Sequence, residues 1–518
     1  MVKIFIAACA ALAVGILAAV MLQLSSTDNL QKFVPPVDET AKPLIPRFKN
    51  VADSIKLSTP SNGPVCSANA AGAAWMDLDH KGSQELMLSS YSGWNMVWSV
   101  SAQKADPLQN LGLIKGATGL SVADYNNDGW DDILVSTQSG PRLYRNYSGR
   151  LKDVTAGSGL KAHKLGMSAA WGDLNRDGLL DLVLVQGNNC VGGTSTGFHF
   201  GQMRLYAQAS TGKFVNSDRL LKPVAIPALG MAAAWTDLNN DGWLDLYLAN
   251  DDMGGIGNQA WLNKRGRLVQ SFRSAEISIN SMGIGLGDTN RDQRMDLAIS
   301  NIEPMNLLLN RRSGFSRKRL SSSLTTHLPI TWGSVVEDFN NDGWEDVFSS
   351  AGGIEGAAPD SQVFYLNRGD RYQITDYAAQ AGLDGPHRGR AVATTDLNRD
   401  GNMDAALASL NGQPALYINQ GAARQGHWLQ VALTGNPSLN SPSSACGARA
   451  WVTAGKLRLM REVDCGSEGF ASSSDRALHF GLGKEDQTVV LKVRWPGGQM
   501  KTYRLQPDRR YNISQQAK

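Results

Sequence analysis

The stretch Asp124-Tyr-Asn126-Asn-Asp128-Gly129-Trp-Asp-Asp132 decides the fold of this chain, because its pattern D-x-N-x-D-G-x-x-D recurs along the sequence. Four further copies match the pattern in full, over residues 173–181, 237–245, 338–346 and 396–404. Two weaker copies cover residues 288–296 and 77–85. A pattern that returns many times in one register indicates a repeated structural unit.

The spacing of oxygen-bearing side chains in each copy favours a cation site. Side chains one, three and five of a tight loop can converge on one point. Residue seven can add its carbonyl oxygen and residue nine a carboxylate, which suits the roughly six to eight oxygen ligands of calcium. The glycine at position six permits a positive φ. An acidic surface turn is the alternative reading of one copy, but the repetition favours the cation. The copies are not EF-hands, because the closing acid stands at position nine and the flanks are strand-like.

The interval between copies predicts a β-propeller. Their first aspartates, at 77, 124, 173, 237, 288, 338 and 396, lie 47, 49, 64, 51, 50 and 58 residues apart. Small residues precede each copy, as in Met167-Ser-Ala-Ala-Trp171, and an apolar run follows, as in Leu182-Val-Leu-Val185. Third and fourth strands are expected after these. We predict an all-β fold with a seven-bladed propeller over residues 47–424, one four-stranded sheet per blade.

The last predicted blade lacks an outer strand, since the repeat pattern stops after residues 415–419. Residues 48–52, followed by 55–57, have the missing character, so we expect an N-terminal strand to pair with the last blade and close the ring, which removes exposed sheet edges. A disordered linker up to Cys66 is the alternative.

Three Gly-rich insertions follow second strands, over residues 187–199, 250–257 and 352–360. They should emerge on one face of the ring, where loops on a rigid scaffold often bind partners. Tolerated insertions without a function are the alternative. They are not phosphate-binding loops, because no Gly-Lys-Ser/Thr and no following helix accompany them.

The N-terminus indicates export. Residues 4–24 are apolar almost throughout, which is long enough to span a bilayer. We predict that residues 1–25 form a signal anchor or a signal peptide, followed by a linker over 26–46. We also predict that the protein is periplasmic or extracellular and anchored in the membrane by residues 4–24. The formal net charge of +3 does not suggest a nucleic-acid partner.

The cysteines favour disulfides in an exported chain. Of the five, Cys9 lies in the apolar segment, and the other four allow three pairings. Cys446 with Cys465 is favoured because the two flank a predicted hairpin. Cys66 with Cys190 then follows by elimination.

From about residue 425 the repeat ends, and residues 425–518 read as a small β-sandwich or barrel-like domain. At this point the chain resembles a known family. The repeats resemble FG-GAP/VCBS repeats, and the tail resembles the ASPIC/UnbV domain. The tail motifs are Cys446-Gly-Ala-Arg, Arg461-Glu-Val, Gly466-Ser-Glu-Gly-Phe470, His479-Phe-Gly-Leu-Gly483 and Arg494-Trp-Pro-Gly-Gly498. Together they resemble the cartilage acidic protein family and its bacterial relatives.

The resemblance implies an exported calcium-binding propeller with about five to six structural Ca²⁺ sites. We expect weaker binding at Asp288, because Gln293 must adopt a strained turn. We expect no binding at Asp77, because Lys81 places an ammonium group where the cation would lie. The expected metal ligands are Asp124, Asn126, Asp128, Asp132, Asp173, Asn175, Asp177, Asp181, Asp237, Asn239, Asp241, Asp245, Asp288, Asn290, Asp292, Asp296, Asp338, Asn340, Asp342, Asp346, Asp396, Asn398, Asp400 and Asp404.

Three functions are compatible with the sequence. The first is an adhesion or protein-interaction scaffold for an unidentified protein or glycan ligand, with structural calcium. The second is an enzyme, carbohydrate-active or other, at the mouth of the propeller channel. Its candidate residues are scattered, however, and no nucleophile elbow or HExxH motif supports it; they are His163, His199, His327 and His387. The third is an accessory factor in assembly or biosynthesis. No catalytic residue is predicted.

Overall fold

The computed structural model describes residues 43–59, 71–91, 93–164, 166–188, 199–252, 255–271, 279–302, 305–320, 329–353, 360–369, 372–385, 387–410, 412–422, 426–466 and 468–517. Residues Pro43–Lys518 form one compact unit. The predicted N-terminal segment 4–24 and the Cys66–Cys190 pair lie outside the described residues, as do residues 189–198, 253–254 and 354–359 of the three insertions. No helix in the described part is long and apolar enough to cross a membrane.

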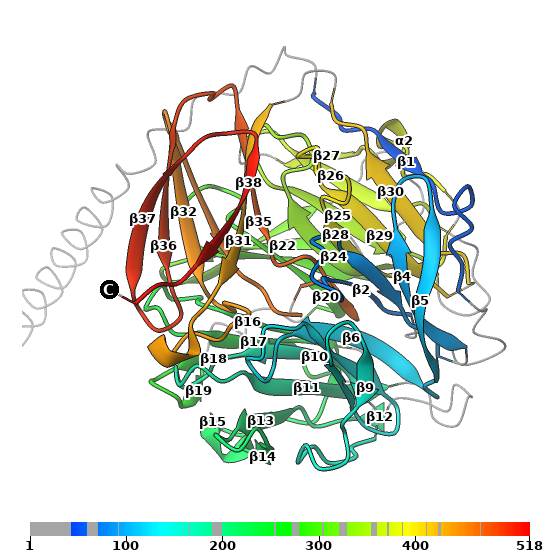
Figure 1. Ribbon diagram of the computed structural model, residues 1–518, viewed down its shortest axis with the longest axis vertical. Coiled ribbons are helices and arrows are strands. Elements are labelled where there is room, and N and C mark those ends of the chain that lie inside the picture. The colour runs from blue at the N-terminus through cyan, green and yellow to red at the C-terminus, as the bar shows by residue number, and fades with distance from the viewer. Residues whose placement is uncertain are drawn as a thin grey trace, which may run out of the picture. The chain divides into compact units, whose positions relative to one another are not determined.

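Within the described part of the repeat region, seven sheets follow one another along the chain, each with at least four strands (Figure 1). The first three consist of β2 (Ala73–Met76), β3 (Glu85–Leu88), β4 (Trp94–Val100) and β5 (Ala105–Leu113); β6 (Ala117–Ala123), β7 (Asp132–Thr137), β8 (Arg142–Asn146) and β9 (Leu151–Asp153); and β10 (Gly166–Gly172), β11 (Asp181–Asn188), β13 (Arg204–Gln208) and β14 (Phe214–Asn216), with β12 (His199–Phe200) beside β11.

The other four sheets continue the same meander. They consist of β16 (Leu229–Thr236), β17 (Asp245–Asp251), β18 (Gln259–Asn263) and β19 (Leu268–Gln270), with β15 (Leu221–Lys222) parallel to β19; β20 (Ser281–Gly287), β21 (Asp296–Asn301), β22 (Met305–Arg311) and β23 (Gly314–Leu320); β24 (Thr331–Glu337), β25 (Asp346–Ala351), β26 (Val363–Asn367) and β27 (Tyr372–Asp376); and β28 (Gly389–Thr395), β29 (Asp404–Ser409) and β30 (Ala415–Asn419). Short helical turns α2 (Ala378–Ala381) and η2 (Asp218–Leu220) lie between strands.

The first strand of each sheet contacts the first strand of the next, and β28 contacts β2, so these strands form a closed ring. Small side chains let the inner strands approach one another: β16, for example, contains three consecutive alanines and is buried throughout. The all-β propeller expected from the sequence is therefore confirmed.

The ring is closed in the way the sequence predicts. β1 (Phe48–Asn50) pairs antiparallel with β30, with Phe48 opposite Asn419. The Phe48 ring lies among four other aromatic rings, 5.6 to 6.5 Å away between centroids. The N-terminal strand therefore supplies both the missing sheet edge and a large apolar side chain to the last blade.

The C-terminal residues form two small sheets, coloured orange to red in Figure 1. One contains β35 (Leu478–Gly483), β31 (His427–Thr434) and β38 (Arg509–Ser514), and the other β33 (Leu457–Glu462), β32 (Arg449–Ala454), β36 (Val489–Arg494) and β37 (Met500–Leu505). A 3-10 turn, η5 (Pro437–Leu439), follows β31. The predicted Cys446–Cys465 disulfide is present and flanks the β32–β33 hairpin. This confirms the predicted pairing.

Candidate functional site: the loop face of the propeller

All seven acidic loops lie at the same edge of the ring. In each blade the first residue of the loop directly follows the innermost strand, and the ninth residue begins the second strand. The loop at Asp124 thus connects β6 to β7. Equivalent connections in a ring of equivalent blades place the loops side by side on one face, which we call the loop face.

The side chains at positions one, three and five turn into their own loop. In the first complete copy, Asp124 Oδ1 and Asn126 Oδ1 both accept from the Asp128 amide, at 3.0 and 2.9 Å. Asp124 Oδ2 accepts from the Gly129 amide at 2.8 Å. The same bonds recur in the loops at Asp173, Asp237, Asp338 and Asp396. In four of these loops the position-three amide also donates to the position-five carboxylate, at 2.9 to 3.1 Å. The three positions therefore lie together, and cation binding by them stays a prediction.

The loop at Asp288 keeps most of this arrangement although it lacks the glycine. Gln293 has a φ of 65°, in the left-handed region that glycine favours, and its amide still donates to Asp288 Oδ2 at 2.9 Å. Asp288 Oδ1 is buried and has no hydrogen-bond partner. A buried carboxylate oxygen without a donor is costly, and a cation would satisfy it.

The ninth aspartates hold strands together. Each uses one oxygen to accept from the amide of loop position two and the other to accept from the amide at the end of the third strand, over 2.7 to 3.3 Å. The residues are Asp132, Asp181, Asp245, Asp296, Asp346 and Asp404. They therefore have a structural task in addition to the predicted metal ligation.

Burial makes the charges of these loops costly. Burial raises the pKa of Asp132 to about 9 and that of Asp245 to about 8. Burial likewise raises the pKa of Asp173 and Asp296 to about 7, and of Asp396 to about 6. A bound divalent cation would favour the ionised carboxylates. An oxygen-only ligand set, converging side chains and an orphaned carboxylate oxygen together fit calcium.

The substituted loop at Asp77 contains a tight acidic cluster. Among the described residues, Asp77, Asp79 and Glu85 are the group of three whose carboxylate oxygens all lie within 4.8 Å of one another. Lys81 Nζ lies 2.5 Å from Asp79 Oδ2. An ammonium group is thus already paired in this loop, in line with the expectation, which stays a prediction, that it does not bind calcium.

A repeated amide joins each blade to the preceding loop. The side-chain amide at the end of the third strand donates to the carbonyl of loop position two in the preceding blade, at 2.8 to 3.0 Å. The donors are Asn146, Gln208, Asn263, Asn310, Asn367 and Asn419. Five of these six donors are asparagines at the same place in the repeat, which is the sequence signal for this contact.

Neighbouring loops are also joined directly, through position four. This residue has a φ of 56° to 62° in every loop. In six loops its side chain donates to the carbonyl at position six of the next loop, and in the first loop His80 stacks on Trp130 with ring centroids 3.8 Å apart. The residues are His80, Asn127, Arg176, Asn240, Arg291, Asn341 and Arg399. Because Arg399 donates to Gly82, the chain of contacts closes around the loop face.

The C-terminal domain contacts this face and reaches the propeller axis. Its segment from Asp464 to Arg476 contains β34 (Ser472–Ser473), which adds to β2 as a parallel strand. Cys465 O accepts from the Trp171 amide at 3.0 Å, and Gly469 exchanges two backbone bonds with Ile284. Further bonds reach β6, β24 and β28, so six of the seven innermost strands bond to the described residues of this segment.

Phe470 lies at the centre of this contact. It is 1% exposed and packs in one apolar cluster with inner-strand side chains. The Trp332 ring centroid lies 5.7 Å from that of Phe470. The Gly466–Phe470 motif, which the sequence offered only as a family marker, therefore fills the axis between the inner strands at this level.

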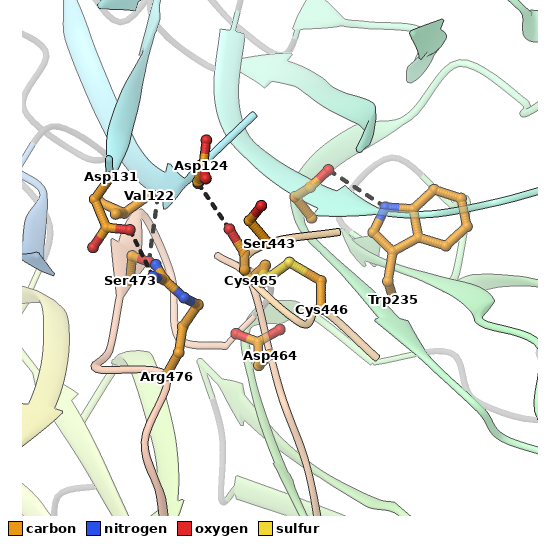
Figure 2. Close-up of a disulfide and its surroundings, with 12 residues drawn as sticks. Val122, Asp124, Asp131, Trp235, Ser443, Cys446, Asp464, Cys465, Ser473 and Arg476 are labelled. Carbon is orange, nitrogen blue, oxygen red and sulfur yellow. Dashed lines mark hydrogen bonds and ion pairs between the residues drawn. A yellow bond between two sulfur atoms is a disulfide. The ribbon is translucent and has the colours of Figure 1, made fainter. Parts of the chain in front are cut away.

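Buried ion pairs fix the two parts together. Arg461 Nη1 lies 2.7 Å from Glu337 Oε2, and Arg461 Nε lies 3.1 Å from Glu345 Oε1. Burial opposes the charge of this guanidinium, but Glu337 and Glu345 hold its pKa above the usual value. Beside the disulfide, Arg476 Nη2 lies 2.6 Å from Asp131 Oδ1 (Figure 2). These arginines of the C-terminal domain thus pair with carboxylates at the loop face.

Of the histidines of the enzyme alternative, the structure describes the side chains of His163 and His387, and these have different hydrogen-bond partners. His163 Nε2 hydrogen-bonds Tyr206 Oη at 2.6 Å, whereas His387 Nδ1 faces Gln413 O at 3.3 Å. The side chain of His199 and all of His327 lie outside the described residues.

Solved structures with similar chain traces include a lectin of Agrocybe aegerita, described as recognising non-reducing terminal N-acetylglucosamine. It shows 14% identity and a TM-score of 0.37, over 66% of this chain and 86% of that chain. BBS1N in complex with ARL6DN shows 11% sequence identity and a TM-score of 0.44, over 74% of this chain and 99% of that chain. Bacillus licheniformis rhamnogalacturonan lyase PL11 shows 11% sequence identity and a TM-score of 0.37, over 72% of this chain and 75% of that chain. At these scores the likenesses carry no argument about function.

The sequence comparisons are more informative. The FG-GAP-like repeat family matches residues 124–184, 237–299 and 338–407, and the ASPIC and UnbV family matches residues 438–518. Cartilage acidic protein 1 of Homo sapiens is 23% identical over 505 residues, covering 90% of this chain and 74% of that protein. The proteins of the same name from Mus musculus and Xenopus tropicalis are 22% identical, over 83% and 74% of this chain and 71% of each relative. The chain therefore belongs to the family of FG-GAP-repeat propeller proteins with a C-terminal ASPIC/UnbV domain, and it is related to cartilage acidic protein 1.

Proposed function

We propose that this protein is an exported scaffold for protein interactions, whose acidic loops bind structural calcium. The observation that carries the proposal is the closed set of acidic loops, with buried carboxylates, onto which the C-terminal domain docks. The FG-GAP repeats and the relationship to cartilage acidic protein 1 support the scaffold part. The disulfide is compatible with export, since disulfides persist in oxidising compartments.

Calcium in this proposal stabilises the folded state. Each ion fixes the connection between the first and second strands of a blade, and the inter-loop contacts pass this order to the neighbouring blade. Binding that occurs only in the folded chain stabilises it by mass action. The ions have no catalytic role in this account.

The partner surface is expected on the ring edge opposite the loop face. The loop face is covered in part by the C-terminal domain, whereas the second strands β11, β17 and β25 end at the opposite edge. The Gly-rich insertions follow those strands. A protein or glycan ligand would therefore be bound at the free edge, and membrane attachment through residues 4–24 would present that edge outside the cell.

The enzyme alternative gains no support from the described residues. Phe470 and its neighbours fill the propeller axis at the level of the inner strands, and His163 and His387 have different hydrogen-bond partners. The accessory-factor alternative remains open as a special case of a scaffold with one dedicated partner.

Calcium titration of the fragment Pro43–Lys518 tests the proposal. We expect about five to six ions per chain. Asp177→Asn should remove one site, whereas Asp486→Asn, an exposed substitution outside the loops, should remove none. Binding of no calcium by the wild-type fragment would refute the calcium part of the proposal.

A further inference from the structure

We infer that the C-terminal domain neutralises the loop at Asp237 with arginine, so that this loop, although its motif is complete, binds calcium more weakly than the other complete loops. The inference rests on the proposed calcium function and concerns how the two domains share one carboxylate. Docking of the C-terminal domain and calcium binding are then competing states of this loop.

Two arginines of the C-terminal domain meet at the first aspartate of this loop. Arg494 Nη2 donates to Asp237 Oδ2 at 2.8 Å, and Arg449 Nη1 lies 3.7 Å from the same oxygen. Asp237 is 0% exposed. The two arginines stand directly opposite each other on the neighbouring strands β32 and β36. The sheet therefore aims a pair of guanidinium groups at one buried carboxylate.

The two arginines divide the nearby acids between them. Arg449 is held by Glu462, whose Oε2 accepts from Arg449 Nε at 3.0 Å and from Nη2 at 2.6 Å. Arg449 also donates to Asp237 O and to Asn240 Oδ1. Asp237 is the carboxylate that pairs with Arg494. Like charges opposite each other in a sheet are unfavourable. Pairing of Arg449 with Glu462 and of Arg494 with Asp237 offsets this repulsion.

A third guanidinium lies at the same loop. Arg176 of the preceding blade donates to Gly242 O and lies 4.2 Å over the Trp243 ring. The region around Asp237 thus already contains three positive groups before any cation binds.

The other first-position aspartates differ. Within the described part of the chain, Asp237 is the one first-position aspartate with an ion-pair partner within 4.0 Å in the C-terminal domain. At the loop of the last blade, the corresponding contact is a neutral one, from Gln430 Nε2 to Asp396 Oδ2 at 2.8 Å. At the second blade, the contact is to the backbone: Ser444 Oγ accepts from the Asp124 amide and does not bond the Asp124 carboxylate.

A divalent ion in this loop would lie near the Arg494 guanidinium, beside the buried Asp237 carboxylate, and like charges at that distance repel each other. We therefore expect calcium affinity at this loop to be at least about tenfold lower than at the other complete loops. By linkage, an ion bound there weakens the Arg494 contact by the same factor.

Calcium titration of the fragment Pro43–Lys518 and its variants, by isothermal calorimetry, tests the inference. Beside the tight class and the weaker Asp288 loop, the wild type should show one further weak site, at the Asp237 loop. Arg494→Gln should move that site into the tight class, whereas Arg494→Lys, which keeps the charge, should leave it weak. Arg504→Gln, an exposed arginine on β37, is the matched control and should change nothing.

Asp237→Asn keeps the test decisive even if Arg494→Gln fails to fold. Loss of a weak site in this variant supports the inference, and loss of a tight site overturns it. Either result requires that the wild type binds calcium elsewhere. If the wild type binds none at all, the proposed calcium function fails first, so the two failures are distinguishable.

Discussion

At the scale of single residues, the repeat motif combines two tasks that the sequence alone does not separate. Positions one, three and five face the loop and fit a cation, while position nine joins the first, second and third strands of its blade. Outside the motif, the asparagine that ends the third strand joins that blade to the preceding loop. Each repeat therefore specifies both a ligand set and the connections between blades.

Replacement of one inter-blade asparagine tests the second task. Asn310 is 0% exposed, and its side-chain amide donates to Leu238 O at 2.8 Å and to Met295 O at 3.1 Å. Asn310→Ala leaves buried carbonyls without donors, so we expect a loss of about 1–3 kcal/mol in the free energy of unfolding. Chemical denaturation measures it, with the exposed Asn512→Ala as the control. Equal stability of the two variants would contradict the assigned role.

The raised carboxyl pKa values predict an unusual pH dependence without metal. A carboxyl whose pKa is raised in the folded state contributes stability below its unfolded pKa, near 4, and that stability is lost as pH rises through the folded value. For Asp396, Asp173 and Asp132 these values are about 6, 7 and 9. In EGTA, the melting temperature should therefore fall as pH rises from about 4 to about 9, most steeply below about pH 6, where all three carboxyls contribute.

Calcium should reverse this trend, because the ion favours the ionised carboxylates. The difference in melting temperature between calcium and EGTA should therefore grow over the same pH range. A difference that shrinks as pH rises would contradict the assignment of these carboxyls to cation sites.

The residue scale also shows where sequence reasoning stops. The oxygen-bearing ligand positions could be predicted because the same residue types repeat in each loop. The contact made by position four could not be predicted, because that position is His80, Asn127 or Arg176 in successive loops. What these residues share is a positive φ and a polar side chain that reaches the next loop. That common feature belongs to the folded ring and leaves no constant letter in the sequence.

At the scale of elements, strand positions and the N-terminal closure follow from local pattern. β1 was predictable because the last blade lacked one strand, and the disulfide because its cysteines flank one hairpin. The pairing of β34 with β2 was not predictable from local pattern. The two strands are about four hundred positions apart, and β34 lies in a Gly- and Ser-rich segment without strand character. Only the closed ring provides the axis that this segment fills.

Phe470→Ala tests whether the axial segment holds the two domains together. The side chain is buried among inner-strand residues, so truncation should cost about 3–5 kcal/mol in the free energy of unfolding. Phe200→Ala, at a side chain that is 46% exposed, is the matched control and should cost far less. Hydrogen exchange should increase along the inner strands of the first variant only. A cost equal to that of the control would mean that the segment is not a structural centre.

At the scale of the whole molecule, propeller and C-terminal domain form one unit. The sequence separates them near residue 425 and leaves their arrangement open, because a change of repeat pattern marks a boundary but not an interface. The structure joins them through buried ion pairs such as Arg461 with Glu337, through β34, and through the arginines at Asp237. We therefore expect the two domains to unfold together.

Thermal unfolding of the fragment Pro43–Lys518, in calcium and in EGTA with metal analysis of the same samples, tests the central claim most directly. The account predicts one cooperative transition, a clear rise in melting temperature with calcium, and about five to six bound ions per chain, with those at the Asp237 and Asp288 loops weakly held. An unchanged melting temperature with no bound metal would contradict it, and would leave the acidic loops as turns whose only task is to connect strands and blades.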